Sequence, residues 1–320
     1  MTRTAFITGI AGQDGSYLAE LLLGKGYRVV GLTMSCGEDC SRIEPIRERI
    51  ELIKGDLTDP ESLNAAVRSA APDEIYNLAA IASVSASFSQ PLLVSDVVGL
   101  GPIRLMEAAK NHARGAKFVQ ASSSEIFGDT KTSPQNELTP LQPRSPYGVA
   151  KAHAHMMVGH YRNYNSMFAS SCIFYNHESP RRGPEYVTRK ISLGVARIAL
   201  GLQEKIELGN LDGRRDWGYA PDYMEAMWRT LQQKDPDDFV IATGVTHTVR
   251  EFLVEACEVA GIKDPMSIVK TNKSNLRPTD PKALVGDAGK ARKTLGWSPK
   301  TSFEQLVRMM VESDMDSEKK

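Results

Sequence analysis

The feature that most constrains the fold is a regular alternation of strand and helix patterns, which begins at a glycine-rich turn. The apolar run Thr4–Thr8 leads directly into Gly9-Ile10-Ala11-Gly12-Gln13-Asp14-Gly15. A helix pattern follows and ends at Gly24-Lys25-Gly26. Strands joined by helices form parallel sheets that are covered on both faces. We therefore predict an α/β fold built on a doubly wound parallel sheet.

The three glycines of the turn indicate that it binds a dinucleotide. Residues without a Cβ permit a tight turn and a close approach of the backbone to a pyrophosphate. The helix N-terminus then offers N–H groups to phosphate oxygens. A glycine-rich turn without a ligand is the alternative. Asp56 suits the adenine end of such a cofactor, although a helix cap before Asp59-Pro60 explains it nearly as well.

The alternation continues through the first half of the chain and changes in the second half. Further expected strands are Arg28–Leu32, Glu51–Lys54, Glu74–Ala79, Lys117–Ala121 and Ala169–Phe174, and further expected helices are Pro60–Ala70 and Pro91–His112. Loops rich in proline and arginine then separate shorter helices. We expect a Rossmann domain at 1–177, with about 216–245 returning to it, and mainly a smaller α/β substrate-binding lobe at 178–320. The charged tail 313–320 is expected to fray.

A second group of residues points to redox chemistry. Ser123, Ser124 and Glu125 follow the strand expected at Lys117–Ala121. Tyr147 and Lys151 are four residues apart and project from one face of a helix. A cation beside a phenol lowers the phenol pKa, giving a base that removes a hydroxyl proton while hydride leaves the same carbon. A surface Tyr–Lys pair and a set of capping serines are the alternative interpretations.

Glu125 narrows the chemistry further. A plain hydroxyl/ketone dehydrogenase needs no carboxylate at this position, whereas a dehydratase does. Oxidation of a hydroxyl to a ketone makes the adjacent C–H acidic. A carboxylate can remove that proton and donate one to a departing hydroxyl.

Composition excludes several other classes. The chain has 39 basic and 39 acidic residues, so nothing indicates a nucleic-acid or membrane-surface partner, and an anionic substrate must be bound by locally placed arginines and lysines. No apolar run is long enough to span a bilayer, and no leader pattern opens the chain, which predicts a cytoplasmic protein. Cys36 and Cys40 share one loop, but no second Cys/His pair is suitably spaced, so we expect no metal site.

The chain resembles the GDP-mannose 4,6-dehydratase family of extended short-chain dehydrogenases/reductases over nearly its whole length. The motifs that carry the resemblance are Thr8–Gly15, Tyr76-Asn77-Leu78-Ala79-Ala80, Ser122-Ser123-Ser124-Glu125, Pro143–Lys151, Asn176–Gly183, Val187-Thr188-Arg189-Lys190 and Arg215-Asp216-Trp217-Gly218. The last three are the most specific, because few other sugar-nucleotide enzymes share them.

The resemblance implies a role for each matching position. The implied catalytic residues are Ser123, Glu125, Tyr147 and Lys151; the cofactor-binding residues are Gly9, Gly12, Gln13, Asp14, Gly15, Asp56, Leu57, Leu78, Ala79, Tyr147 and Lys151; the substrate-binding residues are Ser83, Ser124, Asn176, Glu178, Lys190, Arg215 and Arg277. In this scheme Tyr147 takes the sugar O4 proton, and Glu125 removes the C5 proton and assists loss of the C6 hydroxyl. The implied cofactor is NADP, the implied partner is a GDP-sugar, and the implied assembly is a homodimer or homotetramer.

Three departures from the family pattern keep alternatives open. After Ala80 the family commonly has Gln-Ser-His or Gln-Ser-Phe, whereas this chain has Ile81-Ala82-Ser83, at positions near the hexose and the nicotinamide. Thr33-Met34-Ser35-Cys36 replaces the arginine-containing loop that contacts the NADP phosphate, so NAD is also possible. Val98-Gly99 stands where relatives have a polar residue before the glycine. A related GDP-sugar dehydratase (GDP-manno-heptose, for example), epimerase or reductase is the alternative, followed by a non-catalytic nucleotide-binding sensor.

Overall fold

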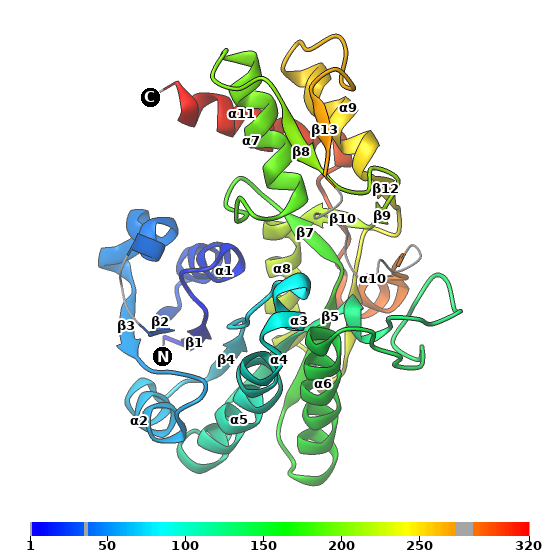
Figure 1. Ribbon diagram of the computed structural model, residues 1–320. Helices are drawn as coiled ribbons and strands as arrows, with labels where there is room; N and C mark the ends of the chain where they lie inside the picture. Colours follow the sequence, from blue (N-terminus) through cyan, green and yellow to red (C-terminus); the bar gives the residue numbers. More distant parts are fainter. Residues whose placement is uncertain (1, 35–37, 273–283, 320) are drawn as a thin grey trace.

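A parallel sheet forms the centre of the molecule. The computed structural model describes residues 2–34, 38–272 and 284–319. Within these ranges the largest sheet has seven strands in the order β11-β6-β5-β4-β1-β2-β3, and every pairing is parallel (Figure 1). The strands are β1 (Thr4–Thr8), β2 (Arg28–Thr33), β3 (Glu51–Lys54), β4 (Glu74–Asn77), β5 (Lys117–Ser123), β6 (Ala169–Phe174) and β11 (Phe239–Ile241). The predicted doubly wound α/β fold is confirmed.

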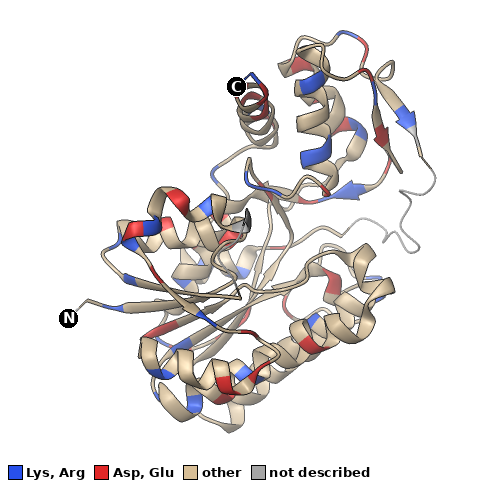
Figure 2. Ribbon diagram, turned by 60° about the vertical axis from the view of Figure 1, so that its left-hand side comes forward, with Lys and Arg blue, Asp and Glu red and all other residues tan. Residues whose placement is uncertain are grey.

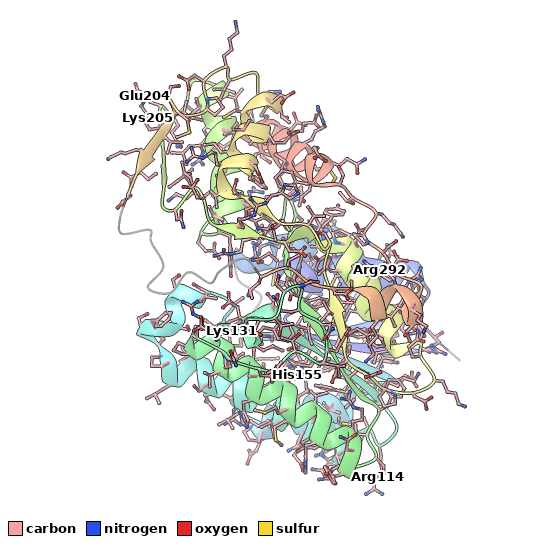
Figure 3. All side chains as sticks on the ribbon, turned by 90° about the vertical axis from the view of Figure 1, so that its right-hand side faces the viewer. Arg114, Lys131, His155, Glu204, Lys205 and Arg292 are labelled. Atoms are coloured by element: carbon pink, nitrogen blue, oxygen red, sulfur yellow. The ribbon has the colours of Figure 1, made fainter. Side chains whose placement is uncertain are left out.

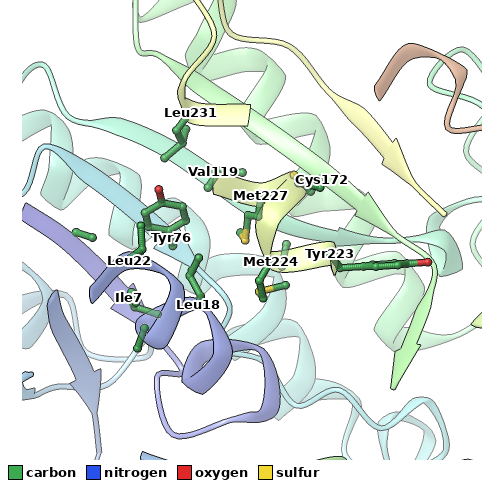
Figure 4. Packing of buried hydrophobic residues seen from close by; sticks show 14 of the residues in the cluster. Ile7, Leu18, Leu22, Tyr76, Val119, Cys172, Tyr223, Met224, Met227 and Leu231 are labelled. Atoms are coloured by element: carbon green, nitrogen blue, oxygen red, sulfur yellow. The ribbon is translucent and has the colours of Figure 1, made fainter. Parts of the chain in front are cut away.

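Helices cover both faces of this sheet. Along β1, Ile7 belongs to a core shared with α1 (Gln13–Gly24) and α8 (Ala220–Leu231), which Figure 4 shows from close by. The neighbouring Phe6 belongs to a core on the opposite face, shared with α2 (Pro60–Ala70) and α5 (Gly101–His112). Successive strand residues point to opposite faces, so a doubly covered strand is apolar throughout, as β1 is.

The segment 84–112 differs from the single helix predicted at Pro91–His112. It contains α3 (Val84–Ser89), α4 (Pro91–Val94), a six-residue π-helix η2 (Ser95–Leu100) and then α5. Pro102 lies in the first turn of α5 and cannot donate a backbone hydrogen bond, so the helix begins afresh there. A 3₁₀-helix, η1 (Glu38–Arg49), was not predicted.

Apart from the two cores on the faces of the sheet, the C-terminal half has its own hydrophobic core, here called the second core, seen at the top of Figure 1. Its elements are α7 (Val187–Ala199), β8 (Ile206–Leu208), α9 (Val249–Val259), β13 (Val269–Thr271) and α11 (Phe303–Glu318). Two small pairings, β7 (Asn176–Glu178) with β10 (Trp217–Tyr219) and β9 (Arg214–Arg215) with β12 (His247–Thr248), join the two parts. Basic and acidic residues are interspersed over the ribbon (Figure 2).

The chain passes more than once between the central sheet and the second core. Helix α8 packs against α1, and β11 is an edge strand of the central sheet, so part of 216–245 lies with the first half. Helix α10 (Gly289–Leu295) and Trp297 also join the core beside α1, with Trp297 Nε1 donating to the Asp222 carbonyl at 2.8 Å. The division into units at residue 177 stays a prediction.

The predicted fraying of 313–320 is wrong as far as Glu318. Helix α11 continues to that residue. Asp314 is fully buried, accepts from Ser192 Oγ at 2.6 Å and pairs with Arg189 at 2.7 Å. Arg197 pairs with Glu318 at 2.8 Å. These contacts with α7 stabilise the end of the helix.

The described residues contain neither a helix long and apolar enough to cross a membrane nor a group of three or more potential metal ligands among His, Cys, Asp and Glu. Cys36 lies outside the described residues, and Cys40 is buried.

Candidate active site

Most of the predicted catalytic and substrate-binding residues line one cavity of about 430 Å³. It lies at the carboxyl ends of β4, β5 and β6, where ligands of open α/β sheets bind, and extends to α7 and β8. Of the predicted residues, those that line it are Asp14, Leu78, Ser83, Ser123, Ser124, Glu125, Tyr147, Lys151, Asn176, Glu178, Lys190 and Arg215. Residues from separate stretches of the chain, from Asp14 to Arg215, are thereby brought together.

Tyr147 and Lys151 lie in the first two turns of α6 (Pro146–Tyr164) and are both buried. Ser145 caps this helix by accepting from the Gly148 amide at 3.0 Å. A Cβ on Gly148 would lie 2.7 Å from the Glu125 carbonyl oxygen, so the glycine lets α6 approach the turn that carries Glu125. Lys151 Nζ donates to the Ala121 carbonyl at 2.6 Å and lies 5.8 Å from the centre of the Tyr147 ring.

The pKa of Tyr147 is shifted in the direction opposite to the prediction. Burial raises the Tyr147 pKa well above its usual value, and this outweighs the hydrogen bond with Ser123 and the nearby Arg182 cation, which lower it. Burial also lowers the pKa of Lys151 to about 8, against the opposing effect of Asp14. The predicted lowering of the Tyr147 pKa by Lys151 is therefore wrong for the polypeptide alone, because desolvation is the larger effect.

Ser123 and Glu125 lie where β5 ends and a 3₁₀ turn (Ser124–Ile126) begins. Ser123 Oγ accepts from the Glu125 amide at 3.3 Å, so this serine caps the turn. Its side chain also hydrogen-bonds with Tyr147. Ser123 thus combines the capping role and the predicted catalytic position, and it holds the Tyr147 hydroxyl beside the turn that carries Glu125.

The glycine turn has the shape that a pyrophosphate requires. Gly9 has a φ of +69°, and a Cβ there would lie 2.9 Å from the Ala79 backbone. Thr8 Oγ1 accepts from the amides of Leu78 and Ala79, both at 3.1 Å, which fixes the two segments together. Gly12 caps α1 without a side-chain hydrogen bond, so the first N–H groups of α1 are available to phosphate oxygens.

Gln13 and Asp14 tie α1 to the segment after β6. Gln13 Nε2 donates to the His177 carbonyl at 3.1 Å. Asp14 Oδ2 lies 2.8 Å from His177 Nε2, and the Tyr175 carbonyl lies 2.8 Å from His177 Nδ1. Both ring nitrogens face acceptors, which favours the doubly protonated imidazolium.

The pKa values of this pair follow from that geometry. Burial lowers the His177 pKa, but the Asp14 carboxylate and the Tyr175 carbonyl raise it more, so it lies above its usual value. Burial raises the Asp14 pKa, but His177 lowers it more, so it lies below its usual value. No role was predicted for His177. Its only signal was its place in the motif Asn176–Gly183.

Glu178 is buried more deeply than a substrate-binding role suggests. Its Oε2 accepts from Thr188 Oγ1 at 2.6 Å and lies 3.2 Å from Arg182 Nε. Arg182 in turn lies over the Tyr186 ring at 3.6 Å and lines the cavity. Glu178 therefore orients Arg182, a cavity residue for which no role was predicted.

The remaining predicted residues lie in three places. Asn176, Lys190 on α7 and Arg215 on β9 line the cavity, and Arg277 lies outside the described residues. Asp56 lines a separate open pocket, and its Oδ1 accepts from the Thr58 amide at 2.8 Å. Asp59, and not Asp56, caps α2, because its Oδ1 accepts from the Glu61 amide at 3.0 Å. Leu57 is buried in the core beneath α5.

Proteins of the same fold define the class. The Thermus thermophilus UDP-glucose 4-epimerase, solved with NAD, superposes with a TM-score of 0.86 at 27% identity, covering 97% of this chain and 98% of that one. A Bacillus anthracis dTDP-glucose 4,6-dehydratase, solved with NAD, gives 0.85 at 23% identity, covering 99% and 98%, and supports the fold alone. The molecule is thus a Rossmann-type enzyme of the short-chain dehydrogenase/reductase class.

Sequence comparison then identifies the family within this class. The family model described as GDP-mannose 4,6 dehydratase matches residues 6–310. An Arabidopsis thaliana GDP-mannose 4,6 dehydratase 1 is 46% identical, covering 99% of this chain and 91% of its own. A Homo sapiens GDP-mannose 4,6 dehydratase is 44% identical, covering 98% and 91%. The chain belongs to the GDP-mannose 4,6-dehydratase family.

Proposed function

We propose that this protein is a GDP-mannose 4,6-dehydratase, which converts GDP-mannose to its 4-keto-6-deoxy product. The overall reaction is oxidation at C4, loss of the C5 proton and the C6 hydroxyl as water, return of the hydride to C6 and uptake by C5 of one proton from solvent, which replaces the proton that O4 gave up. The observation that carries the proposal is the convergence of Glu125 with Ser123, Tyr147 and Lys151 in one cavity, which continues to Lys190 and Arg215. The family membership supports the same reaction.

Tyr147 and Ser123 would handle the proton of the sugar O4. A bound nicotinamide dinucleotide supplies a hydride acceptor at C4 and a donor to C6, and its positive ring favours the phenolate over the phenol. The hydrogen bond from Ser123 favours the phenolate too. Tyr147 can then accept the O4 proton while Ser123 orients that oxygen. Lys151, held by the Ala121 carbonyl, adds positive charge beside the Tyr147 ring.

Glu125 would carry the elimination step. After C4 becomes a ketone, the C5 proton is acidic, and the Glu125 carboxylate takes it. The protonated carboxyl then donates to the departing C6 hydroxyl. The turn cap from Ser123 and the close approach of Gly148 fix the backbone of Glu125 beside Tyr147. One carboxylate therefore serves both as base and as acid on neighbouring carbons.

We infer that the cofactor is NADP, with NAD as the alternative. A nicotinamide dinucleotide is supported by the glycine turn and by the related structures, of which the epimerase was solved with NAD and the protein called RMD from Pseudomonas aeruginosa with NADPH. The end of β2, which distinguishes the two cofactors, runs from Thr33 and Met34 into residues outside the described ranges. Binding of each dinucleotide, followed by fluorescence, tests the choice.

We also infer a homodimer as the smallest assembly, with a homotetramer as the alternative. Helices α4, η2 and α6 are in contact and expose the large apolar side chains of Leu92, Leu93, Leu100, Val149 and Met156. Contiguous apolar patches of this kind mark protein interfaces. Light scattering of a Leu92→Glu/Met156→Glu variant is expected to show a monomer, and an unchanged mass would refute this surface as the interface.

The test of the reaction is mass spectrometry of GDP-mannose incubated with the protein and either NADP or NAD. A product lighter by one water, with no net change of cofactor, is expected. Glu125→Gln is expected to permit C4 oxidation but to block water loss, and Tyr147→Phe to lower turnover by about 10²–10⁴-fold. Full water loss by Glu125→Gln would remove the carboxylate from its role.

The same experiment includes GDP-manno-heptose as a second substrate, because the residues of one cavity wall favour a sugar that differs from the usual substrate of the family. Ala80 and Ala82 line the cavity, and Ile81 packs in the apolar cluster around Tyr147, so this wall offers little hydrogen bonding to a sugar. Water loss from the heptose alone would identify the related dehydratase. Unchanged mass with both sugars would favour an epimerase.

A further inference from the structure

A buried ion pair joins the C-terminal helix α11 to α7. Asp314 on α11 is fully buried, accepts from Ser192 Oγ at 2.6 Å and lies 2.7 Å from Arg189 Nη2. Burial raises the Asp314 pKa, and the contacts with Ser192 and Arg189 offset only part of this effect. A buried ion pair gives little net stability compared with packed apolar residues of similar volume, because both charges lose their hydration. The other contacts of Arg189 indicate a role beyond stability.

Arg189 connects this ion pair to the segment that follows β7. Its Nη1 donates to the Pro180 carbonyl. Its two neighbours in the first turn of α7, Thr188 and Lys190, line the cavity, whereas the Arg189 side chain reaches both Asp314 and Pro180. The rigid fork of a guanidinium can hold two acceptors at once. One side chain thereby joins α11 to a loop of the active site.

The segment after β7 is tied on its other side to α1. Ser179 Oγ donates to Gln13 Oε1 at 2.7 Å. Arg181 Nη2 donates to Glu20 Oε1 at 2.6 Å. Pro180 stands between these two anchored residues, and its carbonyl is the point at which Arg189 holds the segment. The segment is therefore attached to the first half of the chain through α1 and to the second core through α11.

This segment carries a cation of the cavity. Arg182 ends the segment and lines the cavity, and its amide donates to the Ser179 carbonyl at 3.0 Å. The charge of Arg182 acts on the Tyr147 phenol and favours its ionised form. A shift of the Pro180 carbonyl would therefore move a cation that influences the proposed base.

We propose that Arg189, held by Asp314, is a positioning residue for the reaction: it fixes the Pro180 carbonyl and thereby the place of Arg182 in the cavity. This rests on the proposed function, which supplies the reaction. The tie acts through geometry, so apolar residues can replace the packing of the ion pair but not its hydrogen bond to Pro180. Stability and turnover can thus be separated by substitution.

The test compares variants that change this pair in different ways. Asp314→Leu/Arg189→Met keeps apolar packing between α11 and α7 but removes the donor to the Pro180 carbonyl. Ser192→Ala removes the other donor to Asp314 and leaves Arg189 with both of its contacts. Glu204→Gln changes an exposed residue between α7 and β8 and serves as the surface control (Figure 3).

The double variant is expected to lose about 10-fold in kcat with GDP-mannose, with little change of KM. A displacement of 1 Å can cost about 10²-fold in rate, and the loss is smaller here because Thr188 still holds Glu178. Ser192→Ala is expected to melt at a lower temperature than the wild type, because it leaves a buried carboxylate oxygen without its donor, but to keep the wild-type kcat. Glu204→Gln is expected to match the wild type in both.

Hydrogen–deuterium exchange examines the segment without any substrate. The amides of Arg181 and Arg182 both donate to Ser179, at 3.0 Å each. They are expected to exchange about 3–10-fold faster in the double variant, and at the wild-type rate in Ser192→Ala. Asp314→Asn/Arg189→Gln is the second variant should the first not fold: glutamine is shorter than arginine and has a single side-chain nitrogen, so it cannot bridge α11 and Pro180.

Three results would each overturn the role of Arg189. These are a wild-type kcat in the folded double variant, unchanged exchange at Arg181 and Arg182, and a loss of kcat that Ser192→Ala reproduces. None of them touches the proposed reaction, provided that the wild-type protein converts GDP-mannose. A wild-type protein that forms no dehydrated product would refute the proposed function, whereas faster exchange confined to the double variant would still support the hold of Arg189 on the segment.

Discussion

We expect the ion pair between His177 and Asp14, a residue of the glycine turn, to stabilise the folded protein in a pH-dependent way. Replacing Asp14 by asparagine keeps the shape but removes the charge that His177 faces at 2.8 Å. Both side chains are largely buried, at 23% and 11% exposure, so the pair is only weakly screened. A hydrogen bond to a charged group contributes about 1.5–3 kcal/mol, and we take about 2 kcal/mol.

The sign of the pH dependence follows from the two pKa shifts. The His177 pKa is raised in the folded state, so its contribution is complete below its usual value of 6.5 and is lost as pH rises through the raised value. The Asp14 pKa is lowered, so its contribution is complete above its usual value of 3.8 and is lost as pH falls through the lowered value. The full effect is therefore present between these two usual values.

Thermal unfolding of wild type and Asp14→Asn at pH 5.5 and pH 9.5 measures this. At pH 5.5 the variant is expected to melt about 4 °C lower, from about 2 °C per kcal/mol for a chain of this size. As pH rises through the raised His177 pKa, the difference is expected to shrink towards what the α1 dipole contributes, about 0.3–1 kcal/mol. A His177→Gln variant and the Asp14→Asn/His177→Gln double variant complete a double-mutant cycle, which gives the interaction energy of the pair. Equal differences at the two pH values would refute the ion pair.

Three further predictions rest on single contacts. Because burial lowers the pKa of Lys151 to about 8, kcat/KM is expected to fall as pH rises, with a midpoint near pH 8. Lys151→Arg is expected to move this fall to higher pH. A kcat/KM that stays constant up to pH 9.5 in the wild type would contradict the role of Lys151. Asp314→Ala removes the ionic partner of Arg189 and is expected to lower the free energy of unfolding by about 3–5 kcal/mol, measured by urea denaturation. The double variant Asp314→Leu/Arg189→Met is expected to restore much of this loss. Gly9→Ala strains a φ of +69° and meets Ala79, so it is expected to cost about 1–3 kcal/mol and to abolish dinucleotide binding; wild-type binding by fluorescence would refute the fit.

The elements that sequence predicted best are those whose local pattern and tertiary environment agree. Strand β1 is apolar throughout because both its faces are covered, and the glycine that ends it has the positive φ the turn requires. Tyr147 and Lys151 follow from helical spacing alone. Local sequence therefore located both the glycine turn and the Tyr–Lys pair.

The residues that sequence missed depend on partners far along the chain. The His177 pKa is raised because Asp14, 163 residues earlier, faces its ring. The Tyr147 pKa was mispredicted because the spacing shows the neighbouring cation but not the desolvation. Long-range pairing and burial are properties of the folded chain.

The measurement that tests the central claim most directly uses GDP-mannose deuterated at C4. If Tyr147 and Glu125 act as proposed, the product is one water lighter, retains the deuterium in its C6 methyl group and, in ²H₂O, gains one solvent deuterium at C5. Loss of the C4 deuterium to solvent, or its recovery on released reduced cofactor, would contradict an internal hydride return and with it the assignment of this site as a 4,6-dehydratase.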